Sequence, residues 1–168
     1  EFSPENLVNY FNSQNRKISK ETIYTYVDGL CRALILKKVY RYDIAGKSVL
    51  KKINKYYATD LGIAQIKNNN PEFKSYIVLE NIVYNELIYR GYEVYIGKTK
   101  NGEVDFLAKK DGVTKYIQVT YEMNGNESTI EREFGAYKYI DDNNPKYVIS
   151  LDKIDLSRAG IIHLNLID

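Results

Sequence analysis

The stretch from Gly102 to Thr120, GEVDFLAKKDGVTKYIQVT, decides the fold class, because a tight-turn signal separates two apolar runs in it. Asp111-Gly112 is that signal, since Asp-Gly between β-prone segments favours a two-residue hairpin turn. The flanking runs are rich in Val, Ile, Phe and Tyr, the residues that favour strands. We therefore predict strands over Glu103 to Ala108 and over Lys115 to Tyr121.

Helical patterns lie on both sides of this hairpin. Phe73 to Arg90 carries apolar residues at helical spacing and is followed by Gly91, a typical residue just beyond a helix end. Ser128 to Glu131 fits a capping box and predicts the start of a second helix. Further strands are predicted over Tyr92 to Ile96, Lys146 to Leu151 and Ile161 to Ile167. The order is then α-β-β-β-α-β-β, which places the chain in the α/β (α+β) class with a mixed sheet.

The first third of the chain has a different pattern. Ser3-Pro4 predicts the start of one helix and Ser19 the start of another. Strands over Leu36 to Tyr42 and Ser48 to Tyr57 then form a hairpin with Gly46 at its turn. Two helices and a hairpin are the parts of a winged helix-turn-helix. We predict a winged-helix-like module over residues 1–58 and an α/β module over residues 59–168.

The net charge of +2 hides an asymmetry between these two parts. Residues 1–60 carry 11 Lys/Arg against 6 Asp/Glu, a balance of +5, and the remainder carries 13 against 16, a balance of −3. A basic module indicates either an acidic partner such as DNA or a solvated basic face, and the charge alone leaves both open. The residues predicted to contact nucleic acid are Arg16, Lys17, Lys20, Lys47, Lys51, Lys52 and Lys55.

Composition excludes several kinds of site. A single cysteine, Cys31, excludes an intramolecular disulfide, and a single histidine, His163, excludes a site that needs two. We expect Cys31 to be a buried structural thiol and His163 to be partly exposed. No apolar run is long enough to cross a membrane, so we expect a cytoplasmic protein without a membrane partner. Gly91 to Thr99 has five residues between its glycines where a P-loop has four, so we expect no nucleotide site there.

A polar pair interrupts the two apolar strands of the deciding stretch. Asp105 and Gln118 have twelve residues between them, and a hairpin turning at Asp111-Gly112 would place them side by side. A carboxylate buried without a partner costs several kcal/mol, so a counter-charge or an ion is expected. Oxygen ligands converging there, with Glu80 from the preceding helix, would suit Mg²⁺, which could activate water for phosphoryl transfer.

These residues and the element order resemble the PD-(D/E)XK nuclease superfamily. The resemblance implies that Glu80 is the helix acid, Asp105 the metal-binding aspartate and Gln118 the ligand of the next strand. Thr120 falls where that superfamily has its catalytic lysine, and threonine cannot supply a cation. Candidate substitutes are Lys98, Lys109 and Lys115. This departure predicts a nuclease-like fold whose site is not catalytic.

A second resemblance covers roughly residues 3–166. It is carried by Ser3 to Leu7, Arg41 to Asp43, Lys55 to Gly62, Leu79 to Leu87, Arg90 to Tyr92, Gly102 to Phe106 and Tyr116 to Val119. These motifs resemble a prokaryotic domain of unknown function that is the C-terminal part of AAA+-type P-loop ATPases. The resemblance implies that an ATPase module precedes Glu1 and binds the ATP. We therefore expect a non-enzymatic accessory domain that contacts DNA or protein. The alternatives are a Mg²⁺-dependent DNA endonuclease and a purely structural or oligomerising module.

Overall fold

The computed structural model describes residues 4–66 and 75–167, and within them seven strands form one mixed sheet in the order β2-β1-β3-β4-β5-β6-β7. The strands are β1 (Leu36–Asp43), β2 (Ser48–Ala58), β3 (Glu93–Thr99), β4 (Gly102–Lys110), β5 (Val113–Val119), β6 (Lys146–Ser150) and β7 (Ile161–Asn165). β1 runs parallel to β3, and β5, β6 and β7 run parallel to one another. The other neighbouring strands are antiparallel. The predicted α/β class with a mixed sheet is confirmed.

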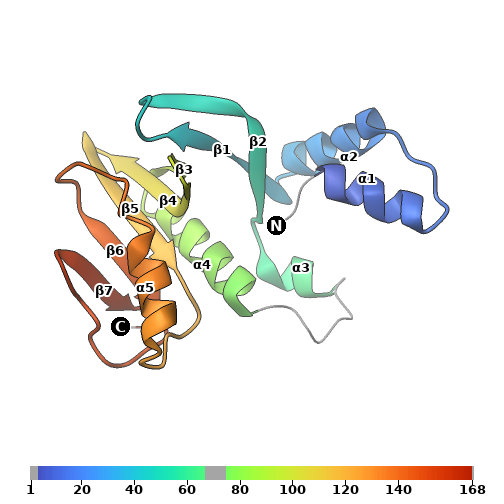
Figure 1. Ribbon diagram of the computed structural model, residues 1–168. Coiled ribbons are helices and arrows are strands. Elements are labelled where there is room, and N and C mark those ends of the chain that lie inside the picture. The colour runs from blue at the N-terminus through green and yellow to red at the C-terminus, as the bar shows by residue number, and fades with distance from the viewer. Residues whose placement is uncertain (1–3, 67–74, 168) are drawn as a thin grey trace.

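Five helices accompany this sheet in the described part of the chain: α1 (Pro4–Ser13), α2 (Lys20–Arg32), α3 (Leu61–Ile66), α4 (Ser75–Tyr89) and α5 (Glu127–Gly135). α4 and α5 cover opposite faces, so the domain has three layers (Figure 1). On the α4 face, Val83, Tyr84 and Leu87 pack with Tyr57, Ile96 and Phe106. On the α5 face, Ile130 and Phe134 pack with Leu107, Tyr116 and Val148. None of the described helices is long and apolar enough to cross a membrane.

The predicted hairpin turn and one predicted helix cap are confirmed. Asp111 and Gly112 both have positive φ, 51° and 77°, as the tight turn between β4 and β5 requires. Ser19 caps α2, because its side chain accepts a hydrogen bond from the Thr22 N–H. Ser3 lies outside the described residues.

The cap of α5 differs from the prediction. Asn126, not Ser128, is the N-cap, and its Oδ1 accepts the Thr129 N–H at 3.2 Å. Ser128 lies in the first turn, and its hydroxyl donates to the same Asn126 oxygen at 2.7 Å. Either residue type is a good cap, and the capping-box pattern pointed to the second of the two.

The α1–α2 pair projects from the end of the sheet formed by β1 and β2 (Figure 1). Val8, Ile23 and Val27 are the buried residues that hold the two helices together. Tyr26 and Leu30 of α2, and Leu34 just beyond its end, are exposed, because the side of α2 that packs against α1 carries Ile23 and Val27.

The β1–β2 hairpin belongs to the same sheet as the α/β module. Arg41 of β1 pairs with Ile96 of β3 in a parallel register, and β2 is the edge strand. The boundary predicted near residue 58 therefore coincides with the end of the edge strand β2, and the strands on both sides of this boundary in sequence belong to one hydrogen-bonded sheet. The two helices and the hairpin follow one another in the predicted order, and their winged-helix-like character stays a prediction.

Candidate functional site

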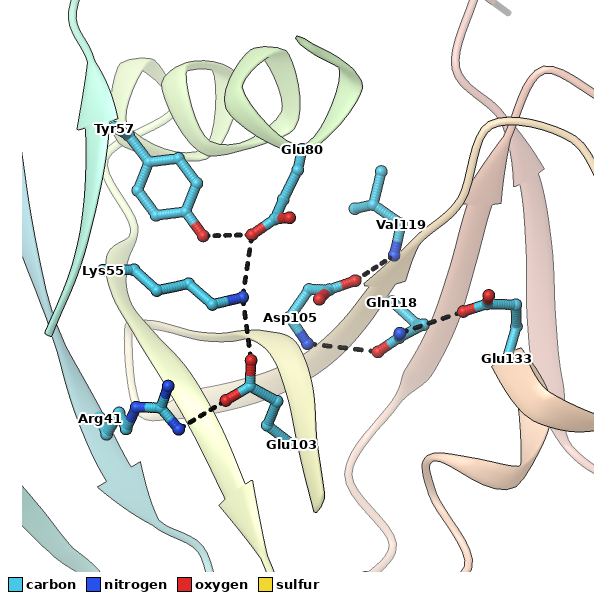
Figure 2. Close-up of polar contacts among 9 residues, drawn as sticks. All are labelled: Arg41, Lys55, Tyr57, Glu80, Glu103, Asp105, Gln118, Val119 and Glu133. Carbon is cyan, nitrogen blue, oxygen red and sulfur yellow. Dashed lines mark hydrogen bonds and ion pairs between the residues drawn. The ribbon is translucent and has the colours of Figure 1, made fainter. Parts of the chain in front are cut away.

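The site begins at an irregularity in β4. Between the Tyr95–Leu107 pair and the Gly97–Val104 pair, β3 contributes one residue, whereas β4 contributes Asp105 and Phe106. This is a β-bulge, a device that redirects side chains and is frequent beside functional sites. Phe106 packs in the α4-side core. The Asp105 carboxylate lies below the helix that carries Glu80 (Figure 2).

At the bulge, side chains replace the hydrogen bonds that would continue the β4–β5 ladder. The ladder ends at the Phe106–Ile117 pair, so its next pair would be Asp105 with Gln118. Instead, the Val119 N–H donates to Asp105 Oδ2 at 2.8 Å, and the Asp105 N–H donates to Gln118 Oε1 at 3.2 Å. Gln118 Nε2 then donates to Glu133 Oε2 of α5 at 3.1 Å. Asp105 and Gln118 are side by side, as predicted, and their side chains connect β4 and β5 where the backbone pairing ends.

The cation of this site comes from β2. Lys55 Nζ lies 3.2 Å from Glu80 Oε1 and 3.0 Å from Glu103 Oε1, and its side chain is only 13% exposed. The same Glu80 oxygen accepts a hydrogen bond from the Tyr57 hydroxyl at 2.5 Å. Arg41 of β1 pairs with the second oxygen of Glu103 at 2.6 Å. Figure 2 shows the resulting chain of alternating charges, from Arg41 through Glu103 and Lys55 to Glu80.

The charges of this cluster are interdependent. Burial, followed by the negative charge of Glu80, raises the pKa of Asp105 to about 7, and the positive charge of Lys55 and the hydrogen bond from the Val119 N–H oppose this rise. Burial alone would lower the pKa of Lys55, but the carboxylates of Glu80, Asp105 and Glu103 outweigh burial and raise it. Burial, followed by the charge of Glu80, also raises the pKa of Tyr57, which keeps its hydroxyl a neutral donor. Lys55 is therefore fully charged, and it is the counter-ion of three acidic side chains.

The predicted metal ligands meet in this cluster, but one oxygen of each is already engaged with a protein donor. Glu80 Oε1 bonds to Lys55 and Tyr57, and Gln118 Oε1 accepts the Asp105 N–H. In the described part of the chain, no group of three or more His, Cys, Asp or Glu side chains is arranged to hold a metal ion. Thr120 is buried, and its N–H donates to the Ile149 carbonyl, so it contributes to the β5–β6 connection.

The lysines considered as substitutes for the missing cation lie elsewhere. Lys98 is exposed on β3, Lys109 lies over the Tyr42 ring, and Lys115 donates to the Tyr92 hydroxyl. Lys55 was predicted to contact nucleic acid, but its side chain is largely buried, because β2 directs it toward Glu80 and Glu103. The sequence contained one indication of this: Lys55 and Tyr57 are two residues apart on a predicted strand, so their side chains lie on the same face of it.

The other predicted nucleic-acid contacts form two separate groups. Arg16, Lys17 and Lys20 lie in and after the α1–α2 loop, and Lys47 and Lys51 lie in and near the β1–β2 turn; all five are exposed. The α1–α2 loop is at the far right of Figure 1 and the β1–β2 turn is at the upper left, so the structure does not join them in one patch. The side chain of Lys52 lies outside the described residues.

His163 and Cys31 are the remaining singled-out residues. His163 is buried, contrary to the prediction, because the loop after β6 folds over it: its Nδ1 accepts the Leu156 N–H at 3.3 Å, and its Nε2 lies 2.8 Å from Ser150 Oγ. Cys31 is half-buried and packs against the α1–α2 core, where burial raises the pKa of its thiol. Its packing agrees with the structural role that we predicted.

Comparison with known proteins finds two similar chains of unassigned role. The chain is 34% identical over 148 residues to an uncharacterized protein of Haemophilus influenzae, and the aligned region covers 88% of this chain and 36% of that protein. It is 33% identical over 142 residues to an uncharacterized protein of Methanocaldococcus jannaschii, and the aligned region covers 82% of this chain and 31% of that protein. No family model and no solved structure matches. The chain therefore spans about a third of the length of the curated relatives it matches.

Proposed function

We propose that this chain is a non-catalytic accessory module, of the kind found C-terminal to AAA+-type ATPases, built on a nuclease-like scaffold. One observation carries the proposal: the Lys55 ammonium lies between Glu80 and Glu103, where a divalent cation would have to bind. A metal ion and an ammonium group compete for the same carboxylates, and the ammonium here is tethered to the protein. The length of the two relatives is compatible with a module that serves a larger protein.

The chemistry of the remaining groups supports the same proposal. Metal-assisted hydrolysis needs oxygen ligands that are free to bind the ion and a site that is open to water. Gln118 Oε1 and one oxygen each of Glu80 and Asp105 are instead committed to protein donors. The cluster is built as an internal salt-bridge network that fastens β1 and β2 to α4 and β4.

A cleavage assay tests the absence of catalysis. Supercoiled plasmid and single-stranded DNA are incubated with wild type and with Asp105→Asn in Mg²⁺ or Mn²⁺. We expect no cleavage above the level of the variant. Cleavage by wild type that is lost in Asp105→Asn would overturn the proposal.

The same geometry gives a second candidate function, a Mg²⁺-dependent DNA endonuclease. Lys55 supplies, from β2, the ammonium that Thr120 cannot supply, and it lies in the same cluster as Glu80 and Asp105. In this alternative Lys55 would position the attacking water, and Glu80 and Asp105 would bind the ion once Lys55 moves aside. Cleavage that requires both Lys55 and Asp105 would favour it, and Lys138→Met, at an exposed lysine outside the acid cluster and outside the basic first third, is the control.

For the partner of the module, we propose DNA contact through the exposed basic groups of the first third. Phosphate contacts release counter-ions, so affinity should fall steeply as salt increases. Titration of a labelled duplex with wild type and with the Arg16→Gln, Lys17→Gln, Lys20→Gln triple variant measures this. Binding that is weaker in the variant and salt-dependent supports DNA contact. Undetectable binding at low salt would favour a protein-contacting or oligomerising module instead.

A further inference from the structure

A cleft of about 760 Å³ lies on the α4 side of the sheet, and none of the residues that line it belongs to the acid cluster. α4 packs against β2, β3, β4 and β5, and on this face no described helix covers β6 and β7. Val83 and Leu87 of α4 form one wall. The residues that complete the apolar lining are Ile117, Tyr147, Ile149, Ile154, Leu164 and Leu166.

The end of the cleft near the start of β5 is positively charged. Arg90 and Lys115 line it together with Glu86, and Glu86 Oε1 is paired with Arg90 at 2.6 Å. Lys115 Nζ donates to the Tyr92 hydroxyl at 2.9 Å and lies over the rings of Tyr92 and Tyr147, at 5.3 and 5.8 Å from their centroids. An ammonium has three N–H groups, so Lys115 retains donors for a further acceptor.

The opposite end of the cleft, after β6, has a different character. Asp152, Lys153 and Asp155 line it. Asp152 accepts hydrogen bonds from the Met123 and Asn124 N–H groups, and Asp155 accepts from Ser157. With two carboxylates against one ammonium, this end repels an anion, and the Arg90–Lys115 end attracts one.

We propose that this cleft binds a small apolar carboxylate, with its anionic group at Lys115 and its apolar body along Ile117, Ile149 and Leu166. The volume lies within the range of small-molecule sites, about 300–1,000 Å³. The wall formed by Val83 and Leu87, together with the aliphatic side chains of Ile117, Ile149 and Leu166, suits an unbranched or flat apolar body. A charge-assisted hydrogen bond from the Lys115 ammonium sets the direction in which the ligand lies.

Isothermal titration with sodium dodecanoate, below its micelle concentration, tests the proposal. Dodecyltrimethylammonium, which has the same tail and the opposite charge, is the matched probe. Lys115→Gln should weaken dodecanoate binding about tenfold, as the loss of one hydrogen bond to a charged group predicts. Leu164→Ser should weaken it as well, because Leu164 lines the cleft. Lys98→Gln and Ile82→Ser, exposed residues that do not line the cleft, are the controls and should bind as wild type does.

Two sets of results decide the matter. Dodecanoate binding that is weakened by Lys115→Gln and Leu164→Ser, and that exceeds binding of the ammonium probe, supports the proposal. Undetectable dodecanoate binding, equal affinity for the two probes, or equal affinity of the cleft variants and the controls would overturn it. Circular dichroism of each variant verifies that the fold is retained.

Discussion

Replacing Lys55 by methionine removes the counter-ion of the acid cluster while keeping a side chain of similar length. Lys55 Nζ contacts Glu80 at 3.2 Å and Glu103 at 3.0 Å, and its positive charge also opposes the rise in the pKa of Asp105. In Lys55→Met, Arg41 is the one cation left among the residues drawn in Figure 2, and it pairs with Glu103, so Glu80 loses its ion pair and Asp105 loses the positive charge of Lys55. The variant therefore tests whether the ammonium is the element that makes this arrangement of acids stable.

The expected loss of stability is large. Breaking a buried ion pair by removing one partner costs about 3–5 kcal/mol, because the charge left behind is poorly solvated. Glu80 is 18% exposed and can recover part of its solvation, so we expect a loss of about 3 kcal/mol at pH 8. Without the lysine, the pKa of Asp105 should rise further above its value in the unfolded chain, because the positive charge of Lys55 opposes that rise in the wild type. The folded variant then binds more protons than the unfolded one, and the loss should shrink as the pH falls.

Urea denaturation, followed by circular dichroism at pH 8 and pH 5, measures both effects. Lys51→Met, an exposed lysine of the same strand, is the control and should change stability by about 0.5 kcal/mol or less. The double variant Lys55→Met, Glu80→Gln should recover stability, because the substitution neutralises one of the uncompensated charges. The reasoning is refuted if Lys55→Met costs no more than Lys51→Met, or if its loss is the same at both pH values.

Two further predictions concern the connections around the cluster. Because the pKa of Asp105 is raised to about 7, wild-type stability should fall as the pH rises from about 4 to about 7, and Asp105→Asn should flatten that fall in urea titrations. Asp105→Ala also removes the acceptor of the Val119 N–H, so it should melt at a lower temperature than Asp105→Asn. Equal melting temperatures of the two variants would contradict the role of that hydrogen bond. The Asn81 side chain bonds both the N–H and the carbonyl of Ala58 at 2.8 Å, so Asn81→Ala should destabilise the fold by about 2 kcal/mol, whereas a change as small as that of exposed Asn9→Ala would show that the connection between α4 and β2 is unimportant.

Two features that depend on local sequence, the β4–β5 hairpin turn and the helix α4, were predicted correctly. Asp111-Gly112 fixes its hairpin by backbone conformation alone, and the apolar spacing of α4 is visible within one helix. The same hairpin was sufficient to place Asp105 beside Gln118, because the register follows from the turn. These predictions needed no information about distant parts of the chain.

The position of Lys55 depended on a contact that the sequence does not reveal. The sequence indicated a separate hairpin, and Lys55 was grouped with the basic residues of its turn. The parallel pairing of β1 with β3 instead joins the hairpin to the sheet and brings Lys55 to Glu80, which is 25 residues away. His163 is a similar case, since its burial follows from the path of the loop between β6 and β7. Neither hydrophobic periodicity nor a local sequence motif predicts such non-local pairings.

Binding of Mn²⁺, measured by the loss of its free electron paramagnetic resonance signal, tests most directly whether Lys55 is the cation of this site. We predict that wild type binds no Mn²⁺ beyond the level of Asp105→Asn, because the ammonium holds the carboxylates a metal would need. Stoichiometric Mn²⁺ binding by wild type that disappears in Asp105→Asn would contradict the account.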